Sequence, residues 1–239
     1  MRHRTLFIGL VGLLAAAGAA CGSGSGSGSG KQTEAGRATG SALVGLFRVD
    51  AGRCTDAGVT AGAWFRMIQP GGKAGEGPFV PNGDSPCGDK TWSPLRPGSD
   101  GGLVTGAYQP QPAEPFDADG RGTAEAILAP TAFFAVPFAN ATNPVDPQTG
   151  AKTTAPTITA TGGKLSGDLS AFAAAWNKQH FNQGAPKPGG AMPGLTAGPS
   201  GTYDAATRHY VLEWSSQIIG GPFNNFTGVW HFEGTFEKR

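Results

Sequence analysis

The segments HYVLEW (residues 209–214) and VWHFEG (residues 229–234) decide the fold, because apolar and polar side chains alternate along both. A period of two residues is typical of a β-strand with one buried face. Between the two segments, residues 217–227 contain the turn signal Gly220-Gly221-Pro222. We therefore expect an antiparallel pair of strands joined by this loop. The expected inward positions are Tyr210, Leu212 and Trp214 in the first segment and Trp230 and Phe232 in the second.

Other apolar stretches of strand length flank this pair. Residues 41–49, 62–69, 131–138 and 157–165 are rich in branched or aromatic residues, and Pro70-Gly71-Gly72 is expected to end the second of them. Residues 70–101 and 183–201 contain many Gly and Pro residues and predict long loops.

Residues 168–176 fit two structures. Leu169, Phe172 and Trp176 have helical spacing among alanines, and Asp168 could cap a helix, although a bulged strand is also compatible. We favour one short helix. The sequence thus predicts a mostly β fold, an antiparallel β-sandwich or barrel-like single domain over residues 41–239 with long Gly/Pro loops.

Composition supports a folded body and limits its partners. All five Trp, all three Tyr and thirteen of the fourteen Phe lie after residue 40, which argues against disorder. Without residues 1–20 the chain keeps 16 of its 18 basic and all 17 acidic side chains, a formal charge of −1. Nucleic-acid binding requires clustered Lys and Arg, so no nucleic acid is expected as a partner.

The first twenty residues have the pattern of an export signal. Arg2 and Arg4 precede an apolar run from Leu6 to Leu14, and residues 15–20 are all small. This run is shorter than the roughly 20 residues that a membrane-spanning helix needs.

The end of this signal resembles that of bacterial lipoprotein precursors. Gly18-Ala19-Ala20-Cys21 supplies the two small residues and the cysteine that receives a diacylglycerol, with Gly18 where Leu is usual. The resemblance implies cleavage before Cys21 and lipidation of its thiol. Residues 22–30 alternate Gly and Ser, so residues 21–40 are expected to be a flexible tether. The predicted location is the extracytoplasmic face of the cell membrane, with the membrane as a partner through the lipid on Cys21.

Two cysteines remain in the body. Export would place Cys54 and Cys87 in an oxidising compartment, where an isolated pair usually forms a disulfide. The body of the chain has no third Cys and no His close to this pair in sequence, so a metal site at the two cysteines is disfavoured. We therefore predict a Cys54–Cys87 disulfide that pins the loop over residues 70–101.

Residues 165–234 resemble a group of exported bacterial proteins, some of which carry PEP-CTERM-type sorting tails. The similarity lies in short motifs: Gly167-Asp168-Leu169-Ser170, Trp176-Asn177, Phe181-Asn182-Gln183-Gly184, Gly201-Thr202-Tyr203, Gly220-Gly221-Pro222-Phe223-Asn224, Phe226-Thr227-Gly228, Trp230-His231 and Glu233-Gly234. The resemblance implies a surface-associated β domain and carries no catalytic role.

Aromatic and amide residues near the two loops at 177–184 and 220–228 suggest a ligand site. Rings can stack on the apolar faces of sugars while amides bind hydroxyl groups, so a cell-wall or glycan ligand is one interpretation. The alternative is that the rings fill the core and the Asn residues form turns. The candidate residues are Trp176, Asn177, Phe181, Asn182, Gln183, Phe223, Asn224 and Phe226.

The outward positions of the alternating segments suggest a second kind of site. His209, Glu213, His231 and Glu233 share one parity and could bind a zinc ion if the register brings them together. A solvated polar sheet face explains the same pattern. No cofactor is otherwise expected. The leading hypothesis is a lipid-anchored, non-enzymatic binding or structural module of the cell envelope, and the alternative is an envelope metal-assisted hydrolase using the His209/His231 face.

Overall fold

The fold is built around the two alternating segments. The computed structural model describes residues 40–239. Its longest strand, β17 (Thr227–Lys238), pairs antiparallel with β16 (His209–Gln217). The register sets Trp214 opposite Trp230 and Leu212 opposite Phe232, and all four side chains are buried. The predicted strand pair, with its apolar positions facing inward, is confirmed.

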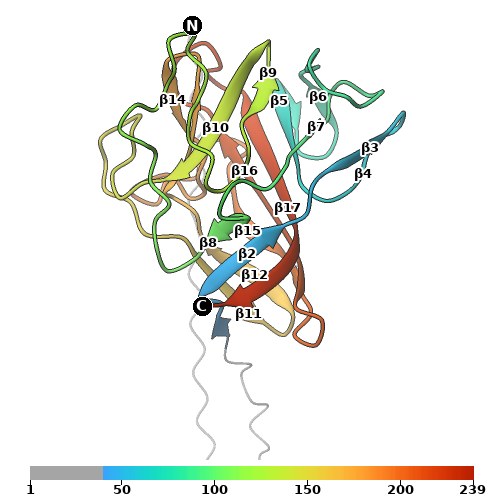
Figure 1. Ribbon diagram of the computed structural model, residues 1–239, viewed down its shortest axis with the longest axis vertical. Helices are drawn as coiled ribbons and strands as arrows, with labels where there is room; N and C mark the ends of the chain where they lie inside the picture. Colours follow the sequence, from blue (N-terminus) through green and yellow to red (C-terminus); the bar gives the residue numbers. More distant parts are fainter. Residues whose placement is uncertain (1–39) are drawn as a thin grey trace, which may run out of the picture. The chain divides into compact units, whose positions relative to one another are not determined.

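Strand β17 is also the centre of an eleven-stranded sheet (Figure 1). Its other edge is shared, because residues 227–231 pair with β5 (Trp64–Lys73) and residues 234–238 pair with β2 (Gly45–Val49). Strands β6 (Gly77–Phe79) and β7 (Ser93–Pro94) pair with β5. The remaining strands of this large sheet are β1 (Ser41–Ala42), β11 (Thr157–Thr161), β12 (Lys164–Asp168) and β15 (Ala197–Tyr203), which lead to β16, and β8 (Gly102–Val104), which pairs with β2.

A four-stranded small sheet covers part of the inner face of the large sheet. Its order is β14 (Gln179–Asn182), β13 (Phe172–Trp176), β10 (Val136–Thr142) and β9 (Thr131–Phe133). A separate hairpin consists of β3 (Arg53–Thr55) and β4 (Gly58–Ala61). Every strand pairing in residues 40–239 is antiparallel.

The core between the two sheets is aromatic. The ring of Trp230 lies 5.1 Å from that of Phe172 and 5.9 Å from that of Phe138, which belong to the small sheet. On the large sheet it lies 4.5 Å from Phe65 and stacks on Trp214 at 5.9 Å. Such ring pairs contribute about 0.5–1.5 kcal/mol each beyond the area they bury.

One residue joins the two sheets by hydrogen bonds. Gln183 follows β14, and its side-chain oxygen accepts the indole N–H of Trp230 at 3.1 Å. Its backbone oxygen accepts the indole N–H of Trp214 at 2.9 Å. A buried indole N–H requires an acceptor, so Gln183 satisfies both tryptophans at the centre of the core.

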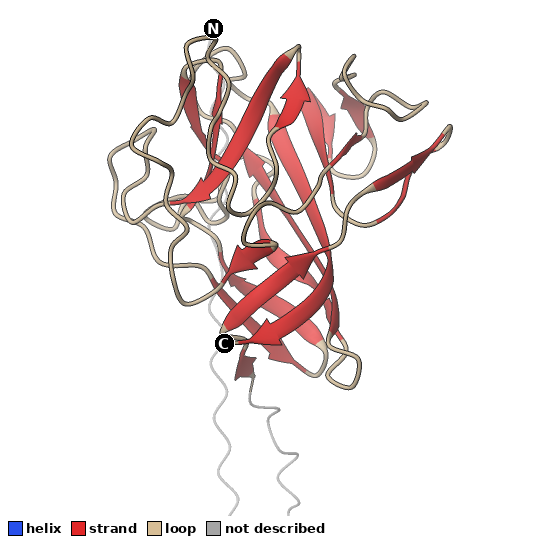
Figure 2. Ribbon diagram, viewed as in Figure 1, coloured by secondary structure: helices blue, strands red, loops and turns tan. Residues whose placement is uncertain are grey.

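The predicted fold class is confirmed in outline. Residues 40–239 contain strands and loops and no helix, and the large sheet curls beneath the small one (Figures 1 and 2). Strand β1 lies at the same end of this domain as the C-terminus, whereas the β9–β10 hairpin lies at the opposite end (Figure 1).

The short helix favoured for residues 168–176 is wrong. Strand β12 ends at Asp168, whose carboxylate accepts the backbone N–H of Ser170 and forms a turn, and β13 begins at Phe172. Ala173–Ala175 are buried because β13 lies between β10 and β14. Small side chains fit this crowded central position, and pairing on both edges outweighs the helix propensity of alanine.

Strand β5 runs further than expected. It continues through Pro70-Gly71-Gly72 to Lys73, and its last residues pair only with β6 across a register shift. Proline is tolerated at such an edge because the missing N–H leaves no ladder hydrogen bond unmade. β5 and β6 thus form a hairpin whose turn contains Ala74 and Gly75.

The predicted disulfide is present. Cys54 of β3 is bonded to Cys87, with 5.2 Å between the two Cα atoms. Cys87 is buried, and its backbone N–H donates to Ser85 Oγ at 3.1 Å. The bond thus pins the loop that contains Cys87, as predicted, and the structure shows that it is fixed to the β3–β4 hairpin.

Candidate binding site: an aromatic pocket between the sheets

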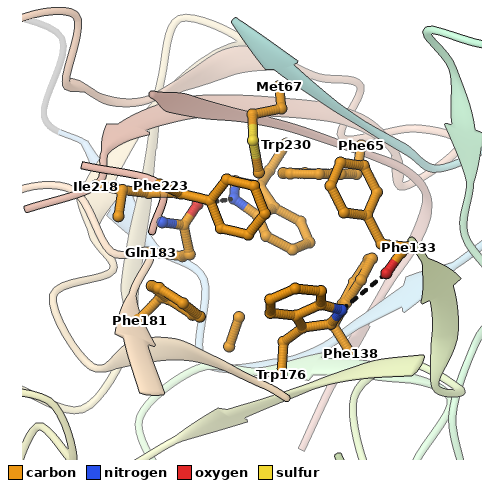
Figure 3. Close-up of a pocket in the computed structure, with 11 residues that line it drawn as sticks. Phe65, Met67, Phe133, Phe138, Trp176, Phe181, Gln183, Ile218, Phe223 and Trp230 are labelled. Atoms are coloured by element: carbon orange, nitrogen blue, oxygen red, sulfur yellow. Dashed lines mark hydrogen bonds between the residues drawn. The ribbon is translucent and has the colours of Figure 1, made fainter. Parts of the chain in front are cut away.

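A pocket lined almost entirely by apolar side chains lies between the two sheets (Figure 3). The large sheet contributes Phe65, Met67 and Trp230, and the small sheet contributes Phe133, Phe138, Ala174, Trp176 and Phe181. Alternation along β13 explains the small-sheet side, because Phe172, Ala174 and Trp176 share the inner face of that strand. Gln183, Ile218 and Phe223 complete the lining.

Phe223 covers the pocket from the loop that connects β16 to β17. Its ring centroid lies 5.3 Å from that of Trp176, 6.1 Å from that of Phe181 and 6.3 Å from that of Phe133. The loop closes on itself, since Ile218 N–H donates to Phe226 O at 2.7 Å and Gly220 N–H donates to Asn224 Oδ1 at 2.7 Å. Gly220 and Gly221 both have positive φ, a conformation that favours glycine.

The structure divides the predicted ligand residues into two groups. Trp176, Phe181, Gln183 and Phe223 line the pocket, and Phe226 packs against Phe223 at 5.7 Å. The three asparagines instead hold local structure. Asn177 has a φ of 48° in the β13–β14 turn, Asn224 accepts the bond from Gly220, and Asn182 is buried, where it bonds to Asp146 and Ser170.

The indole of Trp176 is fixed by the neighbouring hairpin. Its N–H donates to Phe133 O at 2.8 Å and Val136 O at 3.0 Å, on either side of the β9–β10 turn. At that turn Phe134 and Ala135 both have positive φ, 51° and 62°. The ring of Phe134 is 48% exposed and stacks on Phe223 at 6.2 Å, so it forms the rim of the pocket.

A buried amide without a partner lies beside the pocket. Asn140 of β10 is 1% exposed, and neither Nδ2 nor Oδ1 has a hydrogen-bond partner among residues 40–239. The register sets Asn140 directly opposite Ala174, so both side chains lie on the inner face of the small sheet. An unpaired buried amide destabilises a protein by about 1–3 kcal/mol. Such a group needs an explanation, and a ligand that bonds to it would supply one.

The dimensions and lining of the pocket limit what it can accept. Its cavity measures about 40 Å³ with Phe223 in place. A dry cavity of roughly 150 Å³ binds benzene, so an aromatic ring can enter only if Phe223 moves aside. The lining side chains carry no carboxylate, imidazole, amine, hydroxyl or thiol. The pocket can therefore hold an apolar group and offers no nucleophile, acid or base.

The four residues of the zinc hypothesis meet on the outer face of the large sheet. His231 Nδ1 lies 2.7 Å from Glu213 Oε1, and His209 Nε2 lies 3.3 Å from Glu233 Oε1. Glu233 also approaches His231 Nε2 at 3.8 Å and accepts the N–H of Gly62 at 2.9 Å. Within residues 40–239, no group of three or more His, Cys, Asp or Glu side chains is arranged to hold a metal ion.

Sequence reasoning missed a buried lysine near the pocket. Lys187 is 8% exposed, and its ammonium donates to Asn182 O and Ser216 Oγ, each at 2.7 Å. Burial lowers the pKa of Lys187 to about 8, although the nearby Asp146 opposes this shift. A lysine in a Gly/Pro loop gives no sequence signal of burial, because the residues that enclose it come from other parts of the chain.

Lysine 187 ties the loop after β14 to the large sheet. Ser216 belongs to β16 and donates in turn to Gly184 O at 2.8 Å. These bonds hold residues 182–187 beside the end of β16, next to the Gln183 contacts.

Cys21 lies outside the described residues. No helix within residues 40–239 could cross a membrane.

Neither the protein-family models nor the curated proteins nor the solved structures contain a match to this chain. The site must therefore be interpreted from its own geometry.

Replacing Asn140 by Leu should stabilise the unliganded protein. The substitution keeps the side-chain volume and removes two unpaired polar atoms from the core, so the free energy of unfolding should rise by about 1–2 kcal/mol. Urea denaturation would measure this change. Asn82 is a matched control, because it is equally buried and bonded to Ser93 and Ala132, and Asn82→Leu should destabilise the fold. A loss of stability in Asn140→Leu would show that the amide has a structural role.

Lys187 should make the protein more stable as the pH rises from 8 to 10. Its folded-state pKa of about 8 lies below the ordinary value of 10.5, so the unfolded chain binds more protons in this interval. The Lys187→Met variant should therefore lack a gain of about 2 kcal/mol in unfolding free energy that the unmodified protein shows. Denaturation at several pH values would test this, with exposed Lys164→Met as the control. Parallel pH curves for the protein and Lys187→Met would contradict the assignment.

Proposed function

We propose that this chain is a lipid-anchored cell-envelope protein that acts as a non-enzymatic binding module, and that the aromatic pocket is its site. The observation that carries the proposal is a pocket of rings beside an unpartnered buried amide. Ligand sites in proteins are mostly apolar, with a few placed polar groups that orient the ligand. The absence of reactive side chains from the pocket lining favours binding over catalysis.

Backbone strain at the rim supports a role in binding. Two-residue hairpin turns with positive φ at both central positions normally use Asn and Gly, because other residues are strained there. Here Phe134 and Ala135 occupy these positions, at a cost on the order of 1 kcal/mol or more each. The strained turn keeps an aromatic ring exposed at the mouth of the pocket, where a ligand would pass.

The ligand class follows from the lining. A molecule with an apolar body and one hydrogen-bonding group would pack between the rings and reach Asn140 at its inner end. A sugar is a poor fit, because its hydroxyl groups would be buried against rings that cannot satisfy them. Entry of a ring requires movement of Phe223, and Gly220 and Gly221 precede it in a loop whose exposed backbone can rotate.

The anchor at Cys21 completes the proposal. The chain enters the described domain at β1, at the end opposite the β9–β10 hairpin (Figure 1). The first described strand thus lies at the end of the domain away from the rim of the pocket. The hydrolase hypothesis remains a prediction from the sequence, and no observation at His209 or His231 favours it.

Toluene should bind in the pocket and change the methyl NMR signal of Met67. Met67 lines the pocket, whereas Met192 is 47% exposed and serves as an internal control. With ¹³C-methyl methionine labelling, toluene should shift the Met67 signal saturably and leave Met192 unchanged. Ala174→Leu should abolish the shift by filling the pocket, while Ala205→Leu, the same change in an exposed turn, should preserve it.

The Phe223→Ala variant separates the covering ring from the pocket itself. Removing this ring should lower the dissociation constant for toluene severalfold, because the ligand no longer has to displace it. Equal shifts of Met67 and Met192, or a Met67 shift that survives Ala174→Leu, would place the ligand elsewhere and refute the pocket.

The lipid should be found on Cys21. Mass spectrometry of the N-terminal peptide from the membrane fraction should give a chain that begins at Cys21 and carries acyl chains. A Cys21→Ser variant should appear in the soluble fraction, because a serine cannot accept the thioether-linked lipid. An unmodified thiol at residue 21 in the membrane fraction would be inconsistent with the anchor.

A further inference from the structure

A second cavity lies on the outer face of the large sheet, away from the aromatic pocket. It measures about 380 Å³, within the range of small-ligand sites. Its floor is formed by β5, β17, β16 and β15. The β5–β6 hairpin forms its wall, through Ala74, Gly75 and Phe79. We call this cavity the outer cleft.

Strand register arranges the floor of the outer cleft in two rows. The first row crosses the four strands as Trp64, His231, Glu213 and Ser200. The second row crosses them as Arg66, Val229, Ser215 and Ala197. With about 4.8 Å between strands, each row extends about 14 Å. The sheet thus presents on one surface a cation, aromatic rings, hydroxyl groups and a carboxylate, which belong to Arg66, Trp64 and His231, Ser200 and Ser215, and Glu213.

Arg66 is the only residue of the outer cleft lining with a positive charge, and no carboxylate within residues 40–239 forms an ion pair with it. Its guanidinium carbon lies 3.4 Å from the Phe79 ring centroid and 4.1 Å from that of Trp92. Nη2 donates to Thr91 Oγ1 at 2.7 Å, while the buried Nε has no acceptor. Burial lowers the pKa of Arg66, and Asp89 offsets this only in part.

The aromatic rings around Arg66 fix the position of its guanidinium. Trp64 and Trp92 meet edge to face at 4.7 Å, and the imidazole of His231 stacks on Trp64 at 4.9 Å. Trp92 is held by its indole N–H, which donates to Asp89 Oδ2 at 3.1 Å. The planar guanidinium keeps the N–H groups of Nη1, which bond to no residue among 40–239, and the second N–H of Nη2 for a ligand carboxylate.

We propose that the outer cleft binds a carboxylate-bearing saccharide, with Arg66 holding the carboxylate. Trp64 and Trp92 are nearly perpendicular, so one indole would lie flat against the apolar face of a sugar ring and the other would contact the edge of that ring. Ser200 and Glu213 would bond to its hydroxyls, since Glu213 uses only Oε1 for His231. This site is separate from the aromatic pocket and does not depend on the function proposed for that pocket.

A peptide fits the outer cleft less well. Extended peptides usually bind by adding a strand to an open sheet edge. Each floor strand is hydrogen-bonded to the next across the floor, so no free strand edge lies between them for a peptide to pair with. Recognition here must come from side chains, which suits a ligand that is rich in hydroxyl groups.

The experiment is isothermal titration calorimetry of the full folded domain with trigalacturonate and with neutral galactotriose. Trigalacturonate should bind at least tenfold more tightly, because only it carries carboxylates. Arg66→Gln should weaken its binding at least tenfold, and Arg66→Lys should weaken it less, since the charge is kept but the fork is lost. Both variants should unfold cooperatively in urea, which shows that they remain folded.

Phe223→Ala should leave trigalacturonate binding unchanged, which distinguishes this site from the aromatic pocket. Equal affinities for the acidic and neutral trisaccharides would overturn the role of the carboxylate. Binding of neither at millimolar concentration, or binding of tri-aspartate in place of the saccharide, would overturn the proposal as a whole.

Discussion

The two hydrogen bonds that Gln183 accepts from Trp214 and Trp230 fix how the small sheet packs on the large one. Trp214 and Trp230 project from adjacent strands of the large sheet, and each needs an acceptor for a buried N–H. One residue after β14 satisfies both, with its backbone and side-chain oxygens. Even the neighbouring Gly228 is constrained, because a Cβ there would lie 2.1 Å from Gln183 Oε1. The sandwich therefore has one defined spacing at this point, and the surrounding rings pack to it.

Both candidate sites are built on the central strands of the large sheet, on opposite faces. The aromatic pocket occupies the space between the sheets where Trp230, Trp176 and Phe223 do not quite fill it, and Asn140 lies on the same inner face. The outer cleft uses the other face of the same strands, where Trp64, Arg66 and Glu213 are positioned by their pairing with β17. One central strand thus orients an apolar site on one side and a polar site on the other, and each can change without the other.

The sequence predicted correctly the elements whose signal lies in a short stretch or in a rare residue type. The alternation at residues 209–214 and 229–234 fixed the central pair, and the lone cysteine pair predicted the Cys54–Cys87 bond. The helix at residues 168–176 failed because three alanines favour a helix only when no strands pair on both edges. Of the two interpretations of the asparagines, the structure favours local roles, since Asn177 and Asn224 lie in turns and Asn182 bonds to Asp146 and Ser170. Arg66 and Lys187 gave no signal, because their environments are assembled from distant segments.

Hydrogen exchange of the Trp230 indole N–H tests most directly whether Gln183 holds the sheets together. If both sheets form one cooperative unit, this proton should exchange only through global unfolding. Its exchange free energy should then equal that of the most protected backbone amides in β16 and β17. A distinctly lower value for the indole, with those amides still protected, would show that the small sheet separates on its own and would contradict this account.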